Sequence, residues 1–476
     1  MVSPAGLRLT ANPETNGRFH SDWLSMLYPR LKLARNLLCE NGIIFISIDD
    51  SEACNLKKIC DEIFGSENFL TQIVWKNRYN AAKEIHLAQI HEYILMYARD
   101  INKIDPIYLP TTEEYVQRYF KLKDDKFETR GPYRLQPLEA GRSMDERSNL
   151  RFSIPTPDGG SQSPKRQWKW GRDRAMAALS KGELEFTKVS DGWSISTKQY
   201  LRDEANEEYG IKGFSIIDGI YTQSGTKELD AIFGSVTMFP YPKPTKLVSH
   251  LLNIAKVESN EIVLDFFAGA GTTAHGLIAH NLNDGKNRRF ILIQLPEPCA
   301  ADSEAFAAGF KTIADLSKAR IHRYVDTVKL SENTTSDFGF RVLKVDADSF
   351  AATAKTPDLL AQGDLAFDLE NLRKDRSPED LLFQVMLDWG VDLGLPICSE
   401  MISGKKVFFV DGNALAACFD TEISEELVTA LAKRRLHDLP LLKVVFRDAG
   451  YASDSAKINV EQIFKLLSPT TELRTL

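Results

Sequence analysis

The stretch EIVLDFFAGAGTTA, from Glu261 to Ala274, decides the fold. Its short apolar start predicts a buried strand that ends at Asp265. Gly269 and Gly271 then permit a tight turn with close backbone approach, and Thr272 begins a helix. A strand, a glycine turn and a helix in this order are typical of a doubly wound α/β sheet that binds a nucleotide-type cofactor at the turn.

The charge at Asp265 decides between two classes of cofactor. The spacing Gly269-x-Gly271-x-x-Ala274 also fits the dinucleotide fingerprint. A dinucleotide lays its pyrophosphate on the turn, where a carboxylate would repel it, whereas S-adenosylmethionine carries an ammonium and a sulfonium and no phosphate. Asp265 therefore favours S-adenosylmethionine, with a dinucleotide enzyme and a purely structural turn as the alternatives.

The next apolar run, RFILIQ from Arg289 to Gln294, predicts the neighbouring strand. A ribose-binding acid is expected at its end, roughly 20 residues beyond the turn. Gln294 stands there instead. Its amide can donate to and accept from ribose hydroxyls without the charge, so we expect Gln294 at the ribose.

The flanking stretches carry a family resemblance. They read FPYPKPTKL from Phe239 to Leu247 and RRFILIQLPE from Arg288 to Glu297. With DFFAGAGTTA they closely resemble the cofactor-binding motifs of β-class DNA amino-methyltransferases, specifically the modification (Mod) subunits of type III restriction-modification systems. Residues 17–38, 42–50 and 63–69 resemble the same subunits.

This resemblance implies an activity and a set of partners. The expected reaction is transfer of a methyl group from S-adenosylmethionine to N6 of an adenine flipped out of double-stranded DNA. The residues of this chain alone leave N4 of cytosine open. The implied partners are DNA, a second Mod copy in a homodimer, and a restriction (Res) subunit.

The expected site combines the turn with a facing wall. The predicted cofactor-binding residues are Asp265, Phe266, Phe267, Gly269, Gly271, Thr272, Phe239, Lys243, Pro244 and Gln294. The strand at residues 43–48 ends in Asp49 and Asp50 at the edge where such sheets bind ligands. We expect Asp49 to face the site; the alternative is that an acid here only caps the next helix.

Length and composition limit the number of domains and the possibilities for membrane, metal and nucleic-acid binding. The 476 residues suffice for two to four domains, and no apolar run approaches the ~18 residues that span a membrane. Six cysteines show no CxxC pair and no histidine at zinc spacing, which predicts reduced thiols, no metal and a cytoplasmic protein. A net charge of −7 argues against wholesale coating of nucleic acid but allows a local basic groove.

We expect an α/β chain in four parts. Residues 1–100 form the catalytic side of a Rossmann-like methyltransferase domain, 101–235 a target-recognition insert, 236–350 the cofactor-binding part with a strand at 337–346, and 351–476 a C-terminal α/β module. The insert holds cations interleaved with indoles, a pattern that can bind phosphates and unstacked bases. These candidates for DNA contact are Lys165, Arg166, Trp168, Lys169, Trp170 and Arg172; a solvated loop is the alternative.

One motif of the family is missing from the sequence. These enzymes hold the target amine with Asp-Pro-Pro-Tyr, and the nearest string here is Asp105-Pro-Ile-Tyr108, which we interpret as chance. We therefore expect the chain to begin downstream of that motif and to be inactive or weak, or to be a non-enzymatic remnant that binds DNA or docks a subunit. In the family the strand with this motif lies centrally, so the strands at 43–48 and 261–265 should lack their shared neighbour.

Overall fold

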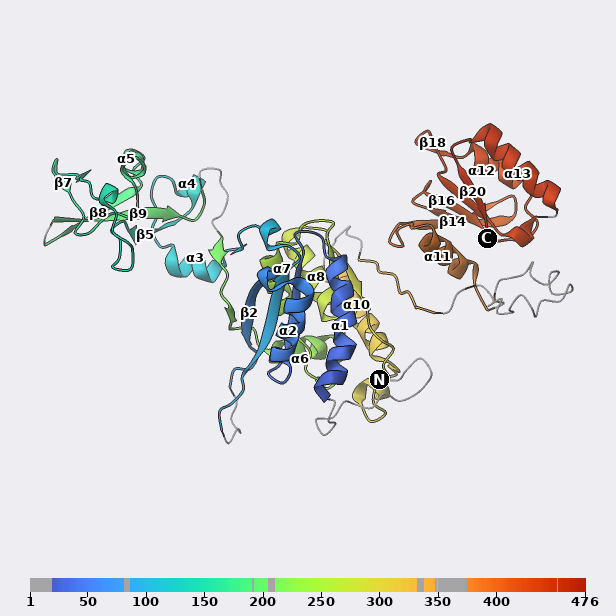
Figure 1. The fold of residues 1–476 in the computed structure, drawn as a ribbon, viewed down its shortest axis with the longest axis horizontal. Helices are drawn as coiled ribbons and strands as arrows, with labels where there is room; N and C mark the ends of the chain where they lie inside the picture. The colour runs from blue at the N-terminus through green and yellow to red at the C-terminus, as the bar shows by residue number, and fades with distance from the viewer. Residues whose placement is uncertain are drawn as a thin grey trace. The chain divides into compact units, whose positions relative to one another are not determined.

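The computed structural model describes residues 19–80, 86–190, 192–203, 210–331, 338–346, 349, 373, 375–451 and 453–476 (Figure 1). The chain divides into two compact units, Met1–Phe338 and Gly339–Leu476. Within the described residues no helix combines the length and the apolarity needed to cross a bilayer.

The first sheet of unit one has the strand order β1-β3-β2-β11. Its strands are β1 (Ile43–Ile48), β2 (Phe69–Lys76), β3 (His91–Ala98) and β11 (Ile216–Ile217). β3 runs antiparallel to both neighbours, and β11 is parallel to β2. Because side chains alternate along β3, Leu95 and Tyr97 face one side of the sheet while Ile94 and Met96 face the other.

Helices cover both faces of this sheet. On one face lie α1 (Phe19–Leu37) and α2 (Ala53–Phe64), whose Leu27, Leu31 and Leu56 bury against Leu95 and Tyr97. On the other face, Leu247 and Ile254 of α7 (Thr245–Ala255) pack with Trp75. Pro29 lies inside α1 and does not divide it.

The second sheet holds the strand of the glycine turn. It consists of β12 (Ile262–Asp265) and β13 (Arg289–Leu292), which are parallel and joined by α8 (Thr272–Asp284). The helices α6 (Thr222–Phe233), α9 (Glu304–Ala307) and α10 (Ile313–Ser331) complete this part.

The two sheets do not pair with each other. Among the described residues β12 pairs only with β13 and β1 pairs only with β3. Every residue of β1 remains half-buried, and Ile262 of β12 is 50% exposed. Among the described residues, the strands β1 and β12 therefore lack a shared neighbour, as expected.

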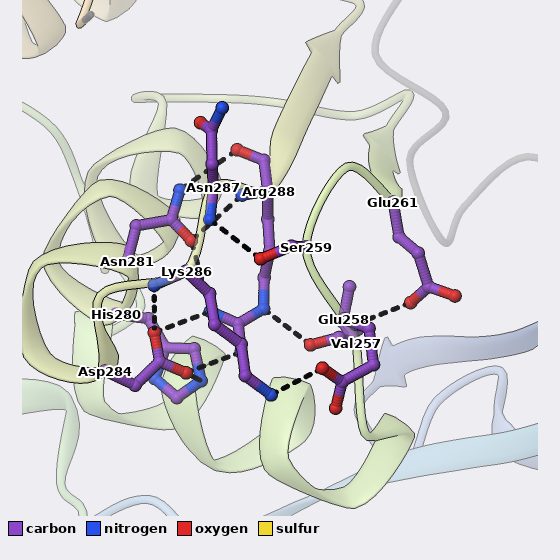
Figure 2. A network of polar contacts seen from close by, with 10 residues as sticks. All are labelled: Val257, Glu258, Ser259, Glu261, His280, Asn281, Asp284, Lys286, Asn287 and Arg288. Carbon is purple, nitrogen blue, oxygen red and sulfur yellow. Dashed lines mark hydrogen bonds and ion pairs between the residues drawn. The ribbon is translucent and has the colours of Figure 1, made fainter. Parts of the chain in front are cut away.

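A buried arginine ties the entry of β12 to the end of α8 (Figure 2). Arg288, 5% exposed, donates from Nε to the carbonyl of Val257 at 2.6 Å and from Nη2 to Asp284 Oδ2 at 2.6 Å. Its Nη1 reaches Asn281 Oδ1 at 3.1 Å. Nearby, Lys286 Nζ pairs with Glu258 Oε2 at 2.6 Å. This cluster holds the loop before β12 in place. It includes no residue of the glycine turn.

The insert enters and leaves through one short ribbon, β4 (Tyr108–Leu109) paired with β10 (Ile211–Lys212). Its core sheet has the order β5-β9-β8, from Tyr133–Pro137, Gly192–Tyr200 and Leu184–Val189. The remaining elements are α3 (Glu113–Tyr119), α4 (Phe127–Arg130), α5 (Arg172–Ser180) and the pair β6 (Ile154–Pro155) and β7 (Ser161–Gln162). After the ribbon the chain returns to the first sheet, because β11 pairs with β2.

The second unit is an α/β module with its own core. Its sheet has the order β14-β15-β16-β19-β20, from Ile397–Ile402, Lys405–Val410, Leu415–Cys418, Lys443–Phe446 and Glu472–Thr475. α11 (Pro378–Asp388) packs on one face, α12 (Glu425–Lys433) and α13 (Asp454–Leu467) on the other, and β17 (Arg435–Leu436) pairs with β18 (Leu439–Pro440). β15 and β16 form a hairpin, and Asp411 and Gly412 both have positive φ in its turn.

The predicted strand at 337–346 is wrong over its described part. Residue 337 lies outside the described residues, and residues 338–346 form no strand. Arg341 instead donates to the carbonyls of Leu393 and Leu395 within the second unit. Alternating apolar residues make a strand only where an edge is available to pair with them, and Val345 is fully exposed here.

Candidate cofactor site

Asp265 organises the turn that follows β12. Its Oδ1 accepts from the backbone N–H of Phe267 at 3.0 Å, and its Oδ2 accepts from Thr273 Oγ1 at 2.6 Å. An ionised carboxylate offers about four acceptor positions, so about two remain for a cationic ligand. Phe266 packs into the core beneath α1 and α2, while Phe267 is 53% exposed beside the carboxylate.

The two glycines of the turn are required by geometry. Gly269 has φ +52° and Gly271 has φ +74°, a region that side chains other than glycine rarely adopt. A Cβ at Gly271 would lie 2.6 Å from Ser317 Oγ of α10. At Gly269 the ring of Phe239 lies 3.6 Å from the position of a Cβ, so the predicted wall residue does lie against the turn.

Gln294 braces the turn from β13. Its Oε1 accepts from the N–H of Gly269 at 2.8 Å, and its Nε2 donates to the carbonyl of Leu295 at 3.2 Å. The amide thus already has one partner at each end. The ribose contact expected for Gln294 stays a prediction.

The wall from Phe239 to Pro244 packs on α6. A Cβ at Gly225 would lie 2.3 Å from the carbonyl oxygen of Pro242, so only glycine allows this approach. Lys243 Nζ lies 3.7 Å from Glu92 Oε2 of β3 and 5.8 Å from the centre of the Trp75 ring. The lysine therefore connects the wall to the first sheet rather than projecting freely.

Behind the turn lies a polar network that the sequence did not reveal. Arg320 of α10 has no exposed surface and donates from Nη1 to Thr272 Oγ1 at 2.8 Å, so Thr272 faces this network. Its Nε donates to His275 Nδ1 at 3.2 Å, and its Nη2 lies 3.4 Å from Glu228 Oε2. One signal for this network was present in the sequence. Arg320 follows Leu316 by four residues, so on a helix the arginine lies on the same side as an apolar residue.

Burial shapes the charges in this network. Desolvation, with Arg320 as a lesser cause, lowers the pKa of His275 to about 3, so its imidazole is neutral near pH 7 and Nδ1 can accept. Desolvation lowers the pKa of Arg320 to about 10, partly offset by Glu228, and the guanidinium stays charged. The ring of His275 stacks on Tyr324 at 3.8 Å between centroids.

At the end of β1 the two acids have different hydrogen-bond partners. Asp49 Oδ1 accepts from the N–H and the hydroxyl of Ser51 within its own turn. Asp50 accepts from Gln89 Nε2, in the loop before β3, at 2.8 Å, and its hydrogen bond raises the pKa of the Tyr93 hydroxyl of β3. The expectation that Asp49 faces the site stays a prediction.

The structure divides the six candidates for DNA contact. Trp168 is 2% exposed, packs in the core of the insert and donates from Nε1 to the carbonyl of Phe152 at 2.8 Å, so it cannot stack on a base without opening that core. Trp170 is half-buried beneath the Arg174 guanidinium at 4.2 Å. The remaining candidates form a cationic edge in which Lys165, Lys169 and Arg172 are exposed and Arg166 is half-buried.

Metal-binding geometry is absent from the described part of the chain. No three His, Cys, Asp or Glu side chains gather there as ligands.

Comparison with known proteins places the chain in a family. A family model described as DNA methylase matches residues 12–300, more than half of the sequence. The chain belongs to the DNA methylase family. Among its relatives, the EcoP15I Mod subunit of a type III restriction-modification enzyme of Escherichia coli is 30% identical over 470 residues, covering 91% of this methylase and 69% of the relative. This places it among the type III modification subunits.

Two further relatives carry the same description. The StyLTI Mod subunit of Salmonella typhimurium is 34% identical over 329 residues, and the EcoPI Mod subunit of Escherichia phage P1 is 28% identical over 465. The methylase chain spans about half the length of the first, at 48%, and 70% of the second.

Two solved structures show weak similarity. The putative DNA modification methylase TTHA0409 of Thermus thermophilus, complexed with S-adenosyl-L-methionine, has a TM-score of 0.29 at 14% identity over 65% of this methylase and 80% of that chain. The PvuII DNA methyltransferase (cytosine-N4-specific) has a TM-score of 0.30 at 11% identity over 68% and 84%. Scores this low add nothing to the family membership.

Proposed function

We propose that the chain binds S-adenosylmethionine at the turn from Asp265 to Gly271 and forms the cofactor-binding and target-recognition parts of a site-specific DNA methyltransferase acting on N6 of adenine. The observation that carries the proposal is a carboxylate with acceptor positions left over, beside a glycine turn covered by the ring of Phe239. Membership among the type III modification subunits supports the choice of DNA and of adenine.

The residues present fit this cofactor better than a dinucleotide. S-adenosylmethionine supplies an activated methyl group when bound. Asp265 would face its cationic methionine end, and the exposed ring of Phe267 and the ring of Phe239 offer flat apolar surfaces for the adenine. The same carboxylate repels a pyrophosphate, which disfavours nicotinamide cofactors.

The catalytic acceptors are the part that the sequence does not contain. Transfer to an exocyclic amine breaks the bond from sulfur to methyl, forms a bond from nitrogen to carbon and releases a proton from the amine. In the family, Asp-Pro-Pro-Tyr supplies the acceptors for that amine, and the sequence has no such string. We therefore expect the purified chain to bind cofactor while methylating DNA weakly or not at all.

Calorimetric titration of the purified chain tests the binding. We expect saturable binding of S-adenosylmethionine and no binding of NAD, with Asp265→Ala weakening the affinity by about tenfold or more because it removes the charge. Thr273→Val is the matched control, since it removes only the hydrogen bond to Asp265 Oδ2 and should change the affinity less than about threefold. Tight binding of NAD, or equal affinity of wild type and Asp265→Ala, would contradict the proposal.

A second candidate function is DNA binding or subunit docking without catalysis. The exposed cations Lys165, Lys169 and Arg172 on the insert favour it. The partners would be double-stranded DNA, a second Mod copy and a Res subunit. Transfer of a tritiated methyl group to DNA by the purified chain would exclude this candidate, and failure to retain DNA on a filter even at low salt would count against DNA binding of either kind.

A further inference from the structure

One face of α10 lies behind both segments of the candidate cofactor site. Leu316 packs with Met238 and Phe239 of the wall. Ser317 lies against Gly271 of the turn. Arg320, four residues after Leu316, falls on the same face of the helix.

Arg320 contacts the turn directly. Besides the bond to Thr272 at the first position of α8, its Nη1 lies 3.5 Å from the carbonyl oxygen of Ala270, between the two glycines. Its Nε donates to His275 one turn further along α8. The guanidinium thus forms hydrogen bonds with both the end of the turn and the start of α8.

The other end of the guanidinium reaches the wall through Glu228. The Glu228 carboxylate on α6 accepts from the N–H of Thr245 at 3.1 Å and from its hydroxyl at 2.9 Å. Thr245 is the first residue of α7 and directly follows Pro244, whose ring cannot cap the helix. Glu228 therefore fixes the end of the wall where α7 begins.

We propose that Arg320 and Glu228 are positioning residues that couple the glycine turn to the facing wall, so that both cofactor-binding segments are held in one arrangement before ligand binds. This inference rests on the proposed function for the identity of the ligand. A fully buried guanidinium suits the role because its forked donors reach several acceptors in fixed directions. A shift in one segment is then passed to the other through shared hydrogen bonds.

The test compares two buried arginines of the same part of the chain. Arg320→Lys keeps the charge and loses the fork; Arg288→Lys makes the same change in the cluster of Figure 2, whose bonds go to Val257, Asn281 and Asp284. Both variants should lower the unfolding temperature. We expect Arg320→Lys to weaken S-adenosylmethionine binding by about tenfold and Arg288→Lys by less than about twofold, because only the first disturbs a pre-organised site.

Hydrogen exchange of the ligand-free protein gives a second readout. In Arg320→Lys the amides of residues 267–271 and those of residues 239–247 should both exchange faster, whereas in Arg288→Lys neither set should change. This readout does not require cofactor binding. If wild type fails to bind S-adenosylmethionine, the proposed function fails, and the exchange pattern still decides the coupling.

Glu228→Gln covers the case in which Arg320→Lys does not fold. The amide keeps an acceptor for Thr245 but loses the charge beside the guanidinium. We expect binding weakened about threefold, and in the double variant a loss smaller than the product of the two single effects. Wild-type affinity in both single variants, faster exchange confined to the turn, or strictly multiplicative losses would overturn the proposal.

Discussion

The backbone of Gly271 leaves no room for a side chain. Its φ of +74° strains any other residue, and a Cβ would press on Ser317 Oγ. We expect Gly271→Ala to lower the free energy of unfolding by about 2 to 4 kcal/mol, measured by urea denaturation.

Gly285 is the control for backbone strain alone. It ends α8 with φ +69°, and a Cβ there would meet nothing within 4 Å. Gly285→Ala should cost only about 1 kcal/mol. Adding Ser317→Ala to Gly271→Ala should recover the steric part; if it recovers nothing, or if both alanine variants cost the same, the close approach of α10 is not the cause.

His275 makes stability depend on pH. Its pKa is about 3 in the folded chain and about 6.5 when unfolded, so between these values the unfolded state binds more protons. Stability attributable to this residue is therefore complete above pH 6.5 and is lost as the pH falls toward 3. Between pH 7 and pH 5 the free energy of unfolding should fall by about 2 kcal/mol more in wild type than in His275→Gln.

Thermal and urea unfolding across pH 5 to 8 checks this expectation. Arg320 of α10 donates to the imidazole and stays charged in that range because its pKa is about 10, and the ring of Tyr324 stacks on the imidazole. Glutamine keeps an acceptor for Arg320 Nε. Equal pH dependence in the two proteins would show that the imidazole is accessible to protons in the folded state.

Local sequence revealed some of these residues and hid others. Asp265 and Gly269 lie in one contiguous motif and Phe239 in a second, and the residue types of both motifs could be recognised in the sequence, so these residues were predicted. Arg320 and Glu228 lie on separate helices 92 residues apart, and only tertiary packing brings them together. Asp49 and Asp50 are adjacent, and no local pattern could indicate that Asp49 bonds to Ser51 while Asp50 bonds to Gln89 and Tyr93.

At the scale of elements, two adjacent residues of the insert have opposite environments. Trp168 is buried and Lys169 is exposed. Trp168→Ala should destabilise the insert by about 3 to 5 kcal/mol, because it leaves a large cavity. Lys169→Ala should change the free energy of unfolding by less than about 0.5 kcal/mol. It should reduce the magnitude of the slope of log DNA affinity against log salt concentration by about one, since one phosphate contact is lost.

Filter binding across a salt series, with circular dichroism for stability, distinguishes the two residues. If Trp168→Ala is stable but no longer binds DNA, the indole of Trp168 contacts DNA after all. A stable Lys169→Ala protein with an unchanged salt slope would remove the lysine from the DNA interface.

Periodicity predicted most elements within a few residues. Residues 43–48 form β1 as expected, and β12 and β13 fall within the strands predicted at 261–265 and 289–294. These strands are apolar enough that burial and local pattern agree. β11 has two residues and exists only because β2 offers it an edge, and no local pattern could indicate it.

At the scale of the molecule, the sheet that contains β1 and the sheet that contains β12 each keep a free edge. Among the described residues, no strand is hydrogen-bonded to the outer edge of β1 or of β12. Free edges are templates for pairing with other chains, and each buried backbone group without a partner costs about 1–3 kcal/mol. The absence of this ladder partner could be predicted, since the family resemblance fixed the position of the missing strand.

The ribbon of β4 and β10 also affects the entropic cost of folding unit one. The core must join Trp75 to Ile220, which are 145 residues apart, through a bond from the indole Nε1 to a carbonyl. Closing a flexible loop of that length costs about 4 kcal/mol in chain entropy, and about 1 kcal/mol less if the insert has already folded and its ribbon holds both ends together. An insert that has already folded therefore lowers the entropic cost of forming the core.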